Sequence, residues 1–402
     1  MDEKKITKVS LVTVIFIFII ILLISLGIVY YIGFAKNNSI INNNQNVNTE
    51  TPIEQTIFNE FAVAKSENPD INYIIAKDEN NNWNEIIEKS QDVIICGKYN
   101  NKLYFADEEA LCYIDLTKKP YTETKWLTYK EYQAYDNEVM GKLSISKAKM
   151  IEDMIYFQYD IFEGGSGNTD GILKVSVTDT SIDNAVQVIS KVDLGKWEID
   201  AENKFLYYVE FENSSVGTLY RFNLVNDEKT KIFDKVKSFD VTSNKILYLL
   251  YNQTTTPNAS SYYPATHDLY IYDINTKENN FIAATSSINS GSLWAFAEYI
   301  NNDVYYKSGD IIKKYNNGKN EIIYSYSSKD GGESIHGQSG FYGFYFIDNT
   351  IIKLILQNAD AKYLVDGKVV TEPTGISTIT VKMKNDSTKD FTIDNIKSNI
   401  SR

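Results

Sequence analysis

A short strand with a tyrosine near its centre recurs six times in this chain, and this repeat limits the possible folds more than any other feature. Each copy combines an Asn, Asp or Gly turn with alternating apolar residues, as β-hairpins do. The copies are NNKLYFAD (100–107), EDMIYFQY (152–159), NKFLYYVE (203–210), NKILYLLY (244–251), NNDVYYKS (301–308) and GFYGFYFID (340–348). Their tyrosines are 40 to 57 residues apart, close to the period of a four-stranded propeller blade. The repeat therefore predicts an all-β protein of propeller type.

Further alternating segments lie before and after most copies, such as VIICGKY (93–99) and ALCYIDL (110–116) around the first copy. Four antiparallel strands per repeat result, and radial repetition of such units hides most strand edges. Six blades are favoured. The alternative is a seventh, composite blade that joins both ends of the domain and is built from INYIIAK (71–77), ISTITVKMK (376–384) and DFTID (390–394). WNEIIEKS (83–90) is predicted to form one short helix.

The repeat places Cys96 and Cys112 on the first and third strands of the first blade. Alternate strands lie roughly 10 Å apart, whereas the Cα atoms of a disulfide lie within about 7 Å. We therefore expect two free, buried thiols.

Two copies of the repeat carry a resemblance to a known family. KLYFAD, which ends at Asp107, and FYFID, which ends at Asp348, are similar to the YWTD motif, although the other copies lack its aspartate and none has its tryptophan. Over residues 93–370 the chain resembles an extracytoplasmic bacterial β-propeller family of unassigned function, whose repeats are similar to the YWTD propellers of low-density-lipoprotein receptors. The resemblance implies a propeller and usually a binding role, without identifying a partner.

The segment 9–35 is almost entirely apolar and has no charged side chain. As a helix it would reach roughly 40 Å, more than the roughly 30 Å hydrocarbon core of a bilayer. Lys4, Lys5 and Lys8 precede it, so the positive-inside rule keeps the N-terminus in the cytoplasm. Cleavage as a signal peptide is the less favoured alternative. The expected organisation is a cytoplasmic tail (1–8), a single transmembrane helix (9–35), a disordered Asn-rich tether (36–56) and an extracytoplasmic β-propeller domain (57–402).

The net charge of the chain and the absence of known catalytic motifs limit the classes of function that it can have. The chain has 40 Lys and Arg against 53 Asp and Glu, a net charge of −13, which argues against nucleic acid as a partner. The sequence lacks the common catalytic and cofactor-binding motifs, namely HExxH, GxSxG, CxxC, the Walker loop and the glycine-rich dinucleotide motif. No catalytic residue is therefore predicted. We expect a membrane-anchored module that binds or scaffolds a protein, a peptide or a cell-wall glycan. The alternative is a cell-surface hydrolase or lyase whose catalytic carboxylates match no known sequence motif.

The long connections are expected to emerge on one face of the propeller. They are the segments 128–142, 159–171, 252–267, 286–292 and 328–339. Long loops on one face of a repeat protein commonly mark its binding surface, although such loops also drift where selection is weak. The candidate ligand-binding residues on this face are Tyr129, Tyr132, Tyr135, Tyr262, Tyr263, Asp330 and Glu333.

One of these loops also offers oxygen ligands to calcium. The candidate ligands are Asp160, Glu163, Asn168 and Asp170. Ser166 and Val177 occupy the positions of the first and last ligands of an EF-hand loop, so a glycine-rich turn with solvated acids is favoured. His267 and His336 are interpreted as exposed loop residues. No metal or cofactor is therefore predicted.

Overall fold

The computed structural model describes residues 56–66, 68, 70–129, 143–162, 168–189, 194–213, 216–242, 244–251, 267–285, 297–331, 340–347, 351–356, 359, 362–371, 378–392 and 396–398. These residues belong to one compact unit, 56–402. They form β-strands, together with the short 3₁₀ helices Ile182–Asn184 and Ser328–Asp330. Within these ranges no helix is long and apolar enough to span a bilayer. The predicted tail, transmembrane segment and nearly all of the tether lie outside the described residues.

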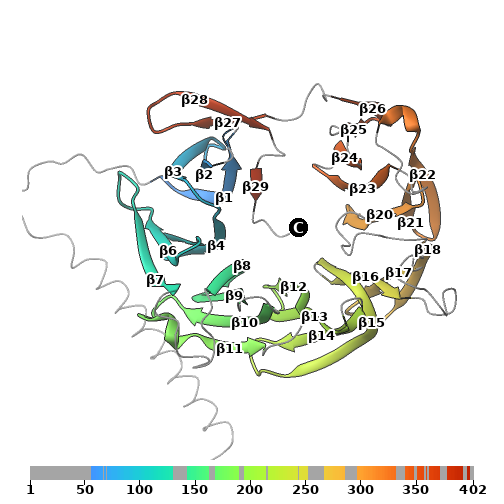
Figure 1. The fold of residues 1–402 in the computed structure, drawn as a ribbon, viewed down its shortest axis with the longest axis horizontal. Helices are drawn as coiled ribbons and strands as arrows, with labels where there is room; N and C mark the ends of the chain where they lie inside the picture. Colours follow the sequence, from blue (N-terminus) through green and yellow to red (C-terminus); the bar gives the residue numbers. More distant parts are fainter. Residues whose placement is uncertain are drawn as a thin grey trace, which may run out of the picture. The chain divides into compact units, whose positions relative to one another are not determined.

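Four sheets consist of four antiparallel strands that follow each other in chain order (Figure 1). The first contains β4 (Ile94–Tyr99), β5 (Lys102–Ala106), β6 (Ala110–Asp115) and β7 (Glu123–Thr128). The second contains β8 (Leu143–Ile151), β9 (Met154–Phe162), β10 (Asn168–Ser176) and β11 (Val186–Ile189). The other two contain β19 (Ala297–Ile300), β20 (Asp303–Ser308), β21 (Ile311–Asn316) and β22 (Lys319–Ser325), and β23 (Phe341–Phe346), β24 (Ile351–Leu356), β25 (Lys362–Val365) and β26 (Lys368–Val370).

A further sheet has seven strands because one long strand belongs to two units. The strands are β12 (Leu194–Asp200), β13 (Phe205–Asn213), β14 (Val216–Asn223), β15 (Lys229–Thr242), β16 (Lys245–Tyr251), β17 (His267–Asp273) and β18 (Asn279–Thr285). The first half of β15 pairs with β14 and the second half with β16, and its register with each partner shifts near Val236. Lys235, which has a φ of 60°, bends the strand at this point. Two four-stranded units thus share β15.

The sixth sheet joins the two ends of the domain, as the composite-blade alternative predicts. Its order is β28-β27-β3-β2-β1-β29, with β1 (Phe58–Lys65), β2 (Asn72–Asp78), β3 (Trp83–Lys89), β27 (Thr378–Lys382), β28 (Thr388–Thr392) and β29 (Ile396–Ser398). The C-terminal β29 pairs antiparallel with β1, and β27 pairs parallel with β3. The chain therefore brings strands from both ends of the domain into one sheet, which we call the composite sheet.

The predicted helix at 83–90 is wrong, because these residues form β3. Trp83, Ile86 and Ile87 are all buried, at the spacing of one helical face. A register shift opposite Ile74 and Ile75 places two successive residues, Ile86 and Ile87, in the core. A β-bulge here therefore has the same apolar pattern as a helix.

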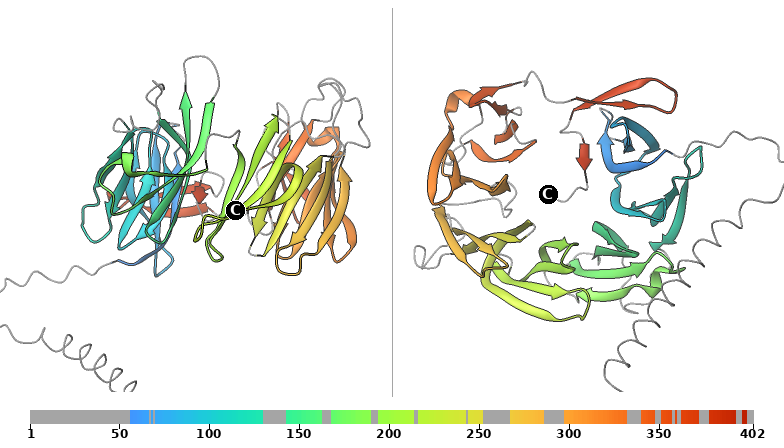
Figure 2. Two further views of the ribbon diagram at one scale, coloured as in Figure 1. Left: turned by 90° about the horizontal axis from the view of Figure 1, so that it is seen from below. Right: turned by 180° about the vertical axis from the view of Figure 1, so that it is seen from behind.

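Hydrophobic clusters connect successive units. Phe105 packs with residues of the composite sheet, and Tyr104 packs with residues of the sheet β8–β11. Similar clusters join the later units in chain order. In the side view of Figure 2 the strands of neighbouring sheets run in broadly the same direction. Successive antiparallel units that pack face to face in this way form an all-β fold of β-propeller type.

Five of the six tyrosines that mark the repeat lie at the same place in their units, on the second strand. Tyr104 lies on the second strand of its unit, as do Tyr156, Tyr207, Tyr248 and Tyr305. Tyr345 instead lies on β23, the first strand of the last sheet. The second strand of that sheet, β24, reads IIKLIL and has no tyrosine. The tyrosine marker thus assigned the last copy to the wrong strand.

Candidate functional site

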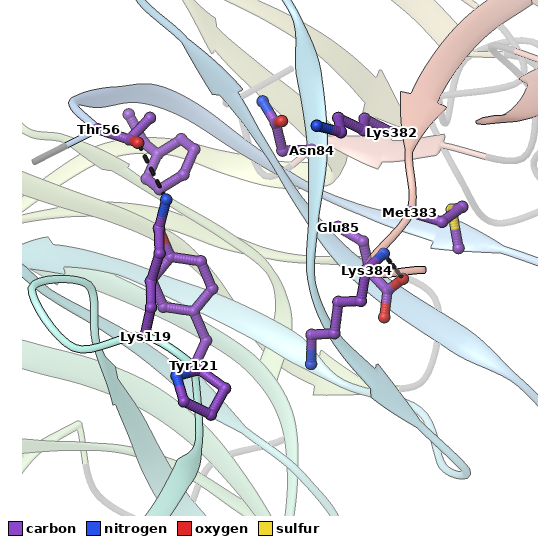
Figure 3. A pocket seen from close by; sticks show the side chains of 10 residues that line it. Thr56, Asn84, Glu85, Lys119, Tyr121, Lys382, Met383 and Lys384 are labelled. Atoms are coloured by element: carbon purple, nitrogen blue, oxygen red, sulfur yellow. Dashed lines mark hydrogen bonds between the residues drawn. The ribbon is translucent and has the colours of Figure 1, made fainter. Parts of the chain in front are cut away.

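A cavity of about 300 Å³ lies where β1 and β3 begin and where the β6–β7 and β27–β28 connections approach them. Lys119 and Tyr121 lie on one side of this cavity, and Lys382 and Lys384 lie on the other (Figure 3). Glu85, on β3, is the acidic residue of its lining. Three lysines thus surround one carboxylate in a protein whose net charge is −13. We call this the lysine cavity.

Local hydrogen bonds fix the walls of the lysine cavity. The backbone N–H of Lys384 donates to Glu85 Oε2 at 3.1 Å, which ties the β27–β28 hairpin to β3. On the other wall, Lys119 Nζ donates to Thr56 Oγ1 at 3.3 Å. The Lys119–Pro120 peptide bond is cis. The cavity is therefore shaped by segments from the beginning and the end of the domain.

The free charge of the lysine cavity is positive. Lys382 Nζ pairs with Asp386 Oδ1 at 3.1 Å, but both side chains are largely exposed, so water weakens this attraction. The Glu85 carboxylate is partly satisfied by the Lys384 N–H. The Tyr121 hydroxyl is buried and has no hydrogen-bond partner in the described structure. Burial raises the pKa of Tyr121, so it is a neutral donor at physiological pH. This combination suits an acidic group of a ligand.

A second charged group lies buried between the composite sheet and β4–β7. Lys89 Nζ pairs with Asp107 Oδ2 at 3.0 Å and with Glu123 Oε2 at 2.6 Å. The Asp107 side chain is 0% exposed, and two backbone N–H groups, of Glu109 and Ala110, also donate to it. Cys112 Sγ lies 3.7 Å from Asp107 Oδ2. We call Lys89, Asp107 and Glu123 the buried ion triad.

The protonation states of the buried ion triad follow from its contacts. Burial alone would raise the pKa of Asp107, but hydrogen bonds from Glu109, Lys89 and Ala110 outweigh it and hold the pKa below its usual value. Burial would lower the pKa of Lys89, but Glu123 and Asp107 hold it above its usual value. Burial and the neighbouring carboxylates raise the pKa of the Cys112 thiol. Asp107 and Lys89 are therefore charged at neutral pH, while the Cys112 thiol is protonated.

Asp107, Cys112 and Glu123 are close enough together for a metal ion, since their ligand atoms lie within 4.8 Å of one another. The Lys89 ammonium, however, already supplies positive charge to both carboxylates. A protonated thiol is also a poor metal ligand. The chemistry of this donor set therefore fits an ion pair that holds two sheets together. Sequence reasoning noticed Asp107 only as the end of KLYFAD and missed its partners.

The two cysteines lie on the strands predicted for them, Cys96 on β4 and Cys112 on β6. Both are free and buried in the structure. Cys96 belongs to the cluster shared with β8–β11, whereas Cys112 belongs to the cluster shared with the composite sheet. The two side chains therefore point to opposite faces of their sheet.

Two residues of the predicted ligand-binding face are described. Tyr129 is only 7% exposed and its hydroxyl donates to the Asp107 carbonyl at 3.0 Å, so its ring packs in the core. Asp330 accepts hydrogen bonds from the Tyr324 hydroxyl at 2.8 Å and from the Ser327 N–H at 2.9 Å, which caps a 3₁₀ turn. The other members lie outside the described residues: Tyr132, Tyr135, Tyr262, Tyr263 and Glu333. A binding role for this face stays a prediction.

The segment 160–171, which was predicted to be a glycine-rich turn and holds the calcium candidates, is strand at both of its ends. Asp160 lies on β9, and Asn168 and Asp170 lie on β10, with Asp160 directly opposite Asp170. Glu163 lies outside the described residues. The glycines and acids of this segment gave a loop signal, but the antiparallel pairing of β9 and β10 extends into it.

The interpretation of His267 as an exposed loop residue is wrong. It begins β17, is 4% exposed and packs edge to face on Tyr251. It alternates with Leu269, which is also buried, so the polar segment before it concealed the start of a strand. His336 lies outside the described residues.

Comparisons with known proteins give no family. No family model matches the sequence, and no curated protein matches it. Among solved structures, an uncharacterized protein of Listeria monocytogenes is 12% identical over 86% of this chain and 100% of its own, with a TM-score of 0.43. The β-propeller domain of the trilobed protease of Pyrococcus furiosus is 11% identical over 60% and 74% of the two chains, with a TM-score of 0.38. TolB of Acinetobacter baumannii is 13% identical over 64% and 61%, with a TM-score of 0.33.

Proposed function

We propose that this protein is a membrane-anchored, extracytoplasmic binding module that captures an acidic group of a protein, peptide or glycan in the lysine cavity. The single observation behind this proposal is the position of Lys119, Lys382 and Lys384 around one cavity in an acidic protein. The apolar segment 9–35 supports the anchor and the outside location of the domain.

The fold supports a binding role through its rigidity. Four four-stranded sheets, the two units that share β15 and the composite sheet correspond to seven blades in our proposal, one more than the six favoured from the sequence. A scaffold of packed sheets holds its connections in fixed positions, which lowers the entropic cost of binding. The long-loop face remains a second proposed contact surface for the same partner.

Catalysis is less well supported than binding. General acid–base chemistry needs a group whose pKa lies near the working pH. Asp107 and Glu123 instead both pair with Lys89, which keeps Asp107 ionised. Asp107 is therefore a poor proton donor.

The proposal can be tested with a fluorescent oligoglutamate peptide and an oligoglutamine peptide of the same length. The full-length protein in detergent should bind only the acidic peptide, and more weakly as salt rises. The double variant Lys119→Glu/Lys384→Glu should weaken binding roughly tenfold or more, because each reversal at an exposed site changes the interaction by about 1 kcal/mol.

The matched control is Lys368→Glu, which reverses an exposed charge on the distant β26. It should leave the affinity nearly unchanged. Equal binding of both peptides, or equal losses in the control and in the double variant, would contradict the proposed role of the lysine cavity.

A further inference from the structure

A larger cavity, of about 550 Å³, lies in the seven-stranded sheet, within the size range of small-molecule sites. It lies beside the β12–β13, β15–β16 and β17–β18 turns. A smaller cavity of about 150 Å³ shares Tyr207, Arg221, Ile274 and Lys277 with it. We call the pair the arginine cavity. These short turns lie at the opposite end of the strands from the predicted long loops, such as 252–267.

Arg221 is the most unusual residue of the arginine cavity. The whole sequence has one other arginine, Arg402 at its C-terminal end, whereas lysine is abundant. The Arg221 guanidinium stacks over the Phe205 ring, 4.5 Å from its centroid, and makes no ion pair with any described residue. Stacking fixes the plane of the guanidinium and leaves its N–H edge available. A planar fork of this kind suits a carboxylate better than a lysine does.

Tyr207 supplies a second donor. The residue is 0% exposed and lines both parts of the arginine cavity, and its hydroxyl proton has no acceptor among the described residues, although the Arg221 guanidinium lies beside the hydroxyl oxygen. Burial raises the pKa of Tyr207 to about 12, although Arg221 opposes the rise. The hydroxyl is thus protonated at neutral pH. An unpaired buried hydroxyl is costly, and an oxygen atom of a ligand would satisfy it.

The rim of the arginine cavity carries amide and charged groups suited to hydroxyls. Asn203, Asn244 and Asn275 line it together with Glu202. The Asn203 amide is held by Asp200 Oδ2 at 2.8 Å. Asn244 and Asn275 lie in turns, and their side chains make no hydrogen bond with another described residue. Amides donate and accept at once, which is what a polyhydroxylated ligand requires.

From this arrangement we propose that the arginine cavity binds a carboxylate-bearing sugar of the uronic-acid type. Arg221 and Tyr207 hold the carboxylate, and Glu202, Asn244 and Asn275 hold the hydroxyls at the rim. The ligand is a free sugar acid or the end of an acidic glycan, since both present the same groups. This site is separate from the lysine cavity and does not depend on the function proposed for it.

The test is calorimetric titration of the full-length protein with glucuronate, with glucose, acetate and inorganic phosphate as comparison ligands. Glucuronate should bind most tightly, acetate weakly, and glucose not measurably. Tighter binding of glucose or phosphate than of glucuronate would overturn the assigned ligand class, and a lack of glucuronate binding would overturn the site.

Two substitutions at equivalent positions of the repeat separate binding from folding. Tyr207→Phe removes only the unpaired hydroxyl, so it should weaken glucuronate binding about tenfold without lowering fold stability. Tyr248→Phe is the matched control, because the Tyr248 hydroxyl already accepts a hydrogen bond from Asn279 Nδ2 at 2.8 Å. The control should lower stability and leave binding intact. Arg221→Lys should weaken binding more than Tyr207→Phe, and unchanged affinity in Tyr207→Phe would refute the proposal even if Arg221→Lys fails to fold.

Discussion

Replacing Lys89 with methionine tests whether the buried ion triad holds two sheets together. Methionine keeps most of the apolar stem of lysine but removes the ammonium that pairs with Asp107 and Glu123. The side chains of Lys89, Asp107 and Glu123 are 11%, 0% and 20% exposed, so water replaces little of the lost charge. Breaking a buried pair from one side costs about 3–5 kcal/mol. Because two backbone N–H groups still donate to Asp107, we expect a loss near 3 kcal/mol.

The pH dependence of this loss has a definite sign. In the natural protein the folded pKa of Asp107 lies below its unfolded value, so its stabilising effect is present above the unfolded pKa and disappears as the pH falls through the folded pKa. In Lys89→Met we expect the folded pKa of Asp107 to be higher than in the natural protein, because burial remains while the Lys89 ammonium that lowers the pKa is gone. The ionised carboxylate is then less well stabilised in the fold, and the deficit should shrink as the pH falls from 7 toward about 4.

Urea unfolding followed by tryptophan fluorescence, at several pH values between these limits, measures the deficit. The matched control is Lys65→Met, because Lys65 pairs with Asp92 at 3.4 Å with side chains that are 41% and 75% exposed. An exposed pair is worth about 0–1 kcal/mol, so this variant should unfold almost like the natural protein. A Lys89→Met deficit below about 1 kcal/mol at pH 7, or one that stays constant with pH, would refute the reasoning about burial.

Three further predictions concern other parts of the chain. Cys96 and Cys112 should resist a thiol-specific reagent in the folded protein, because burial raises the pKa of both thiols; rapid labelling without denaturant would argue against their placement. Gly217→Ala should lower stability by about 2 kcal/mol, because a Cβ would lie 2.2 Å from the Glu210 carbonyl oxygen; an unchanged urea midpoint would show that the strand adapts. The full chain should remain in membranes after a high-salt wash, and deletion of 9–35 should release it.

The strands and their tight turns could be predicted because the signals are local. Asn100 and Asn101 have φ values of 46° and 60°, and Asn301 and Asn302 have φ values of 50° and 68°. Two successive residues with positive φ form the turn that joins twisted antiparallel strands, and asparagine tolerates this conformation. An Asn-Asn pair before an alternating segment therefore indicates a hairpin for a physical reason. In these two units the pair marks the start of the second strand.

The remaining features depend on contacts between distant segments. Ile86 and Ile87 are both buried only because β2 shifts register against β3, which no pattern within 83–90 reveals. The buried ion triad forms across two sheets. Arg221 was not singled out from the sequence, and its place opposite Tyr207 depends on the register in which β13 pairs with β14. Sequence alternation thus predicts which residues form strands, but not which charged side chains meet between sheets.

The composite sheet cannot be completed until the end of the chain has been synthesised, although its central strands are made first. Strands β1 to β3 are made first, whereas β27 and β29, which cover their two edges, are made last. The hydrogen bond from the Lys384 N–H to Glu85 spans 299 residues of sequence, and contacts of such long range form slowly. During that interval both edges of the early three-stranded sheet are open to pairing with other chains. A chain truncated before residue 378 would keep these edges open permanently, so premature termination should yield aggregates instead of a smaller folded domain.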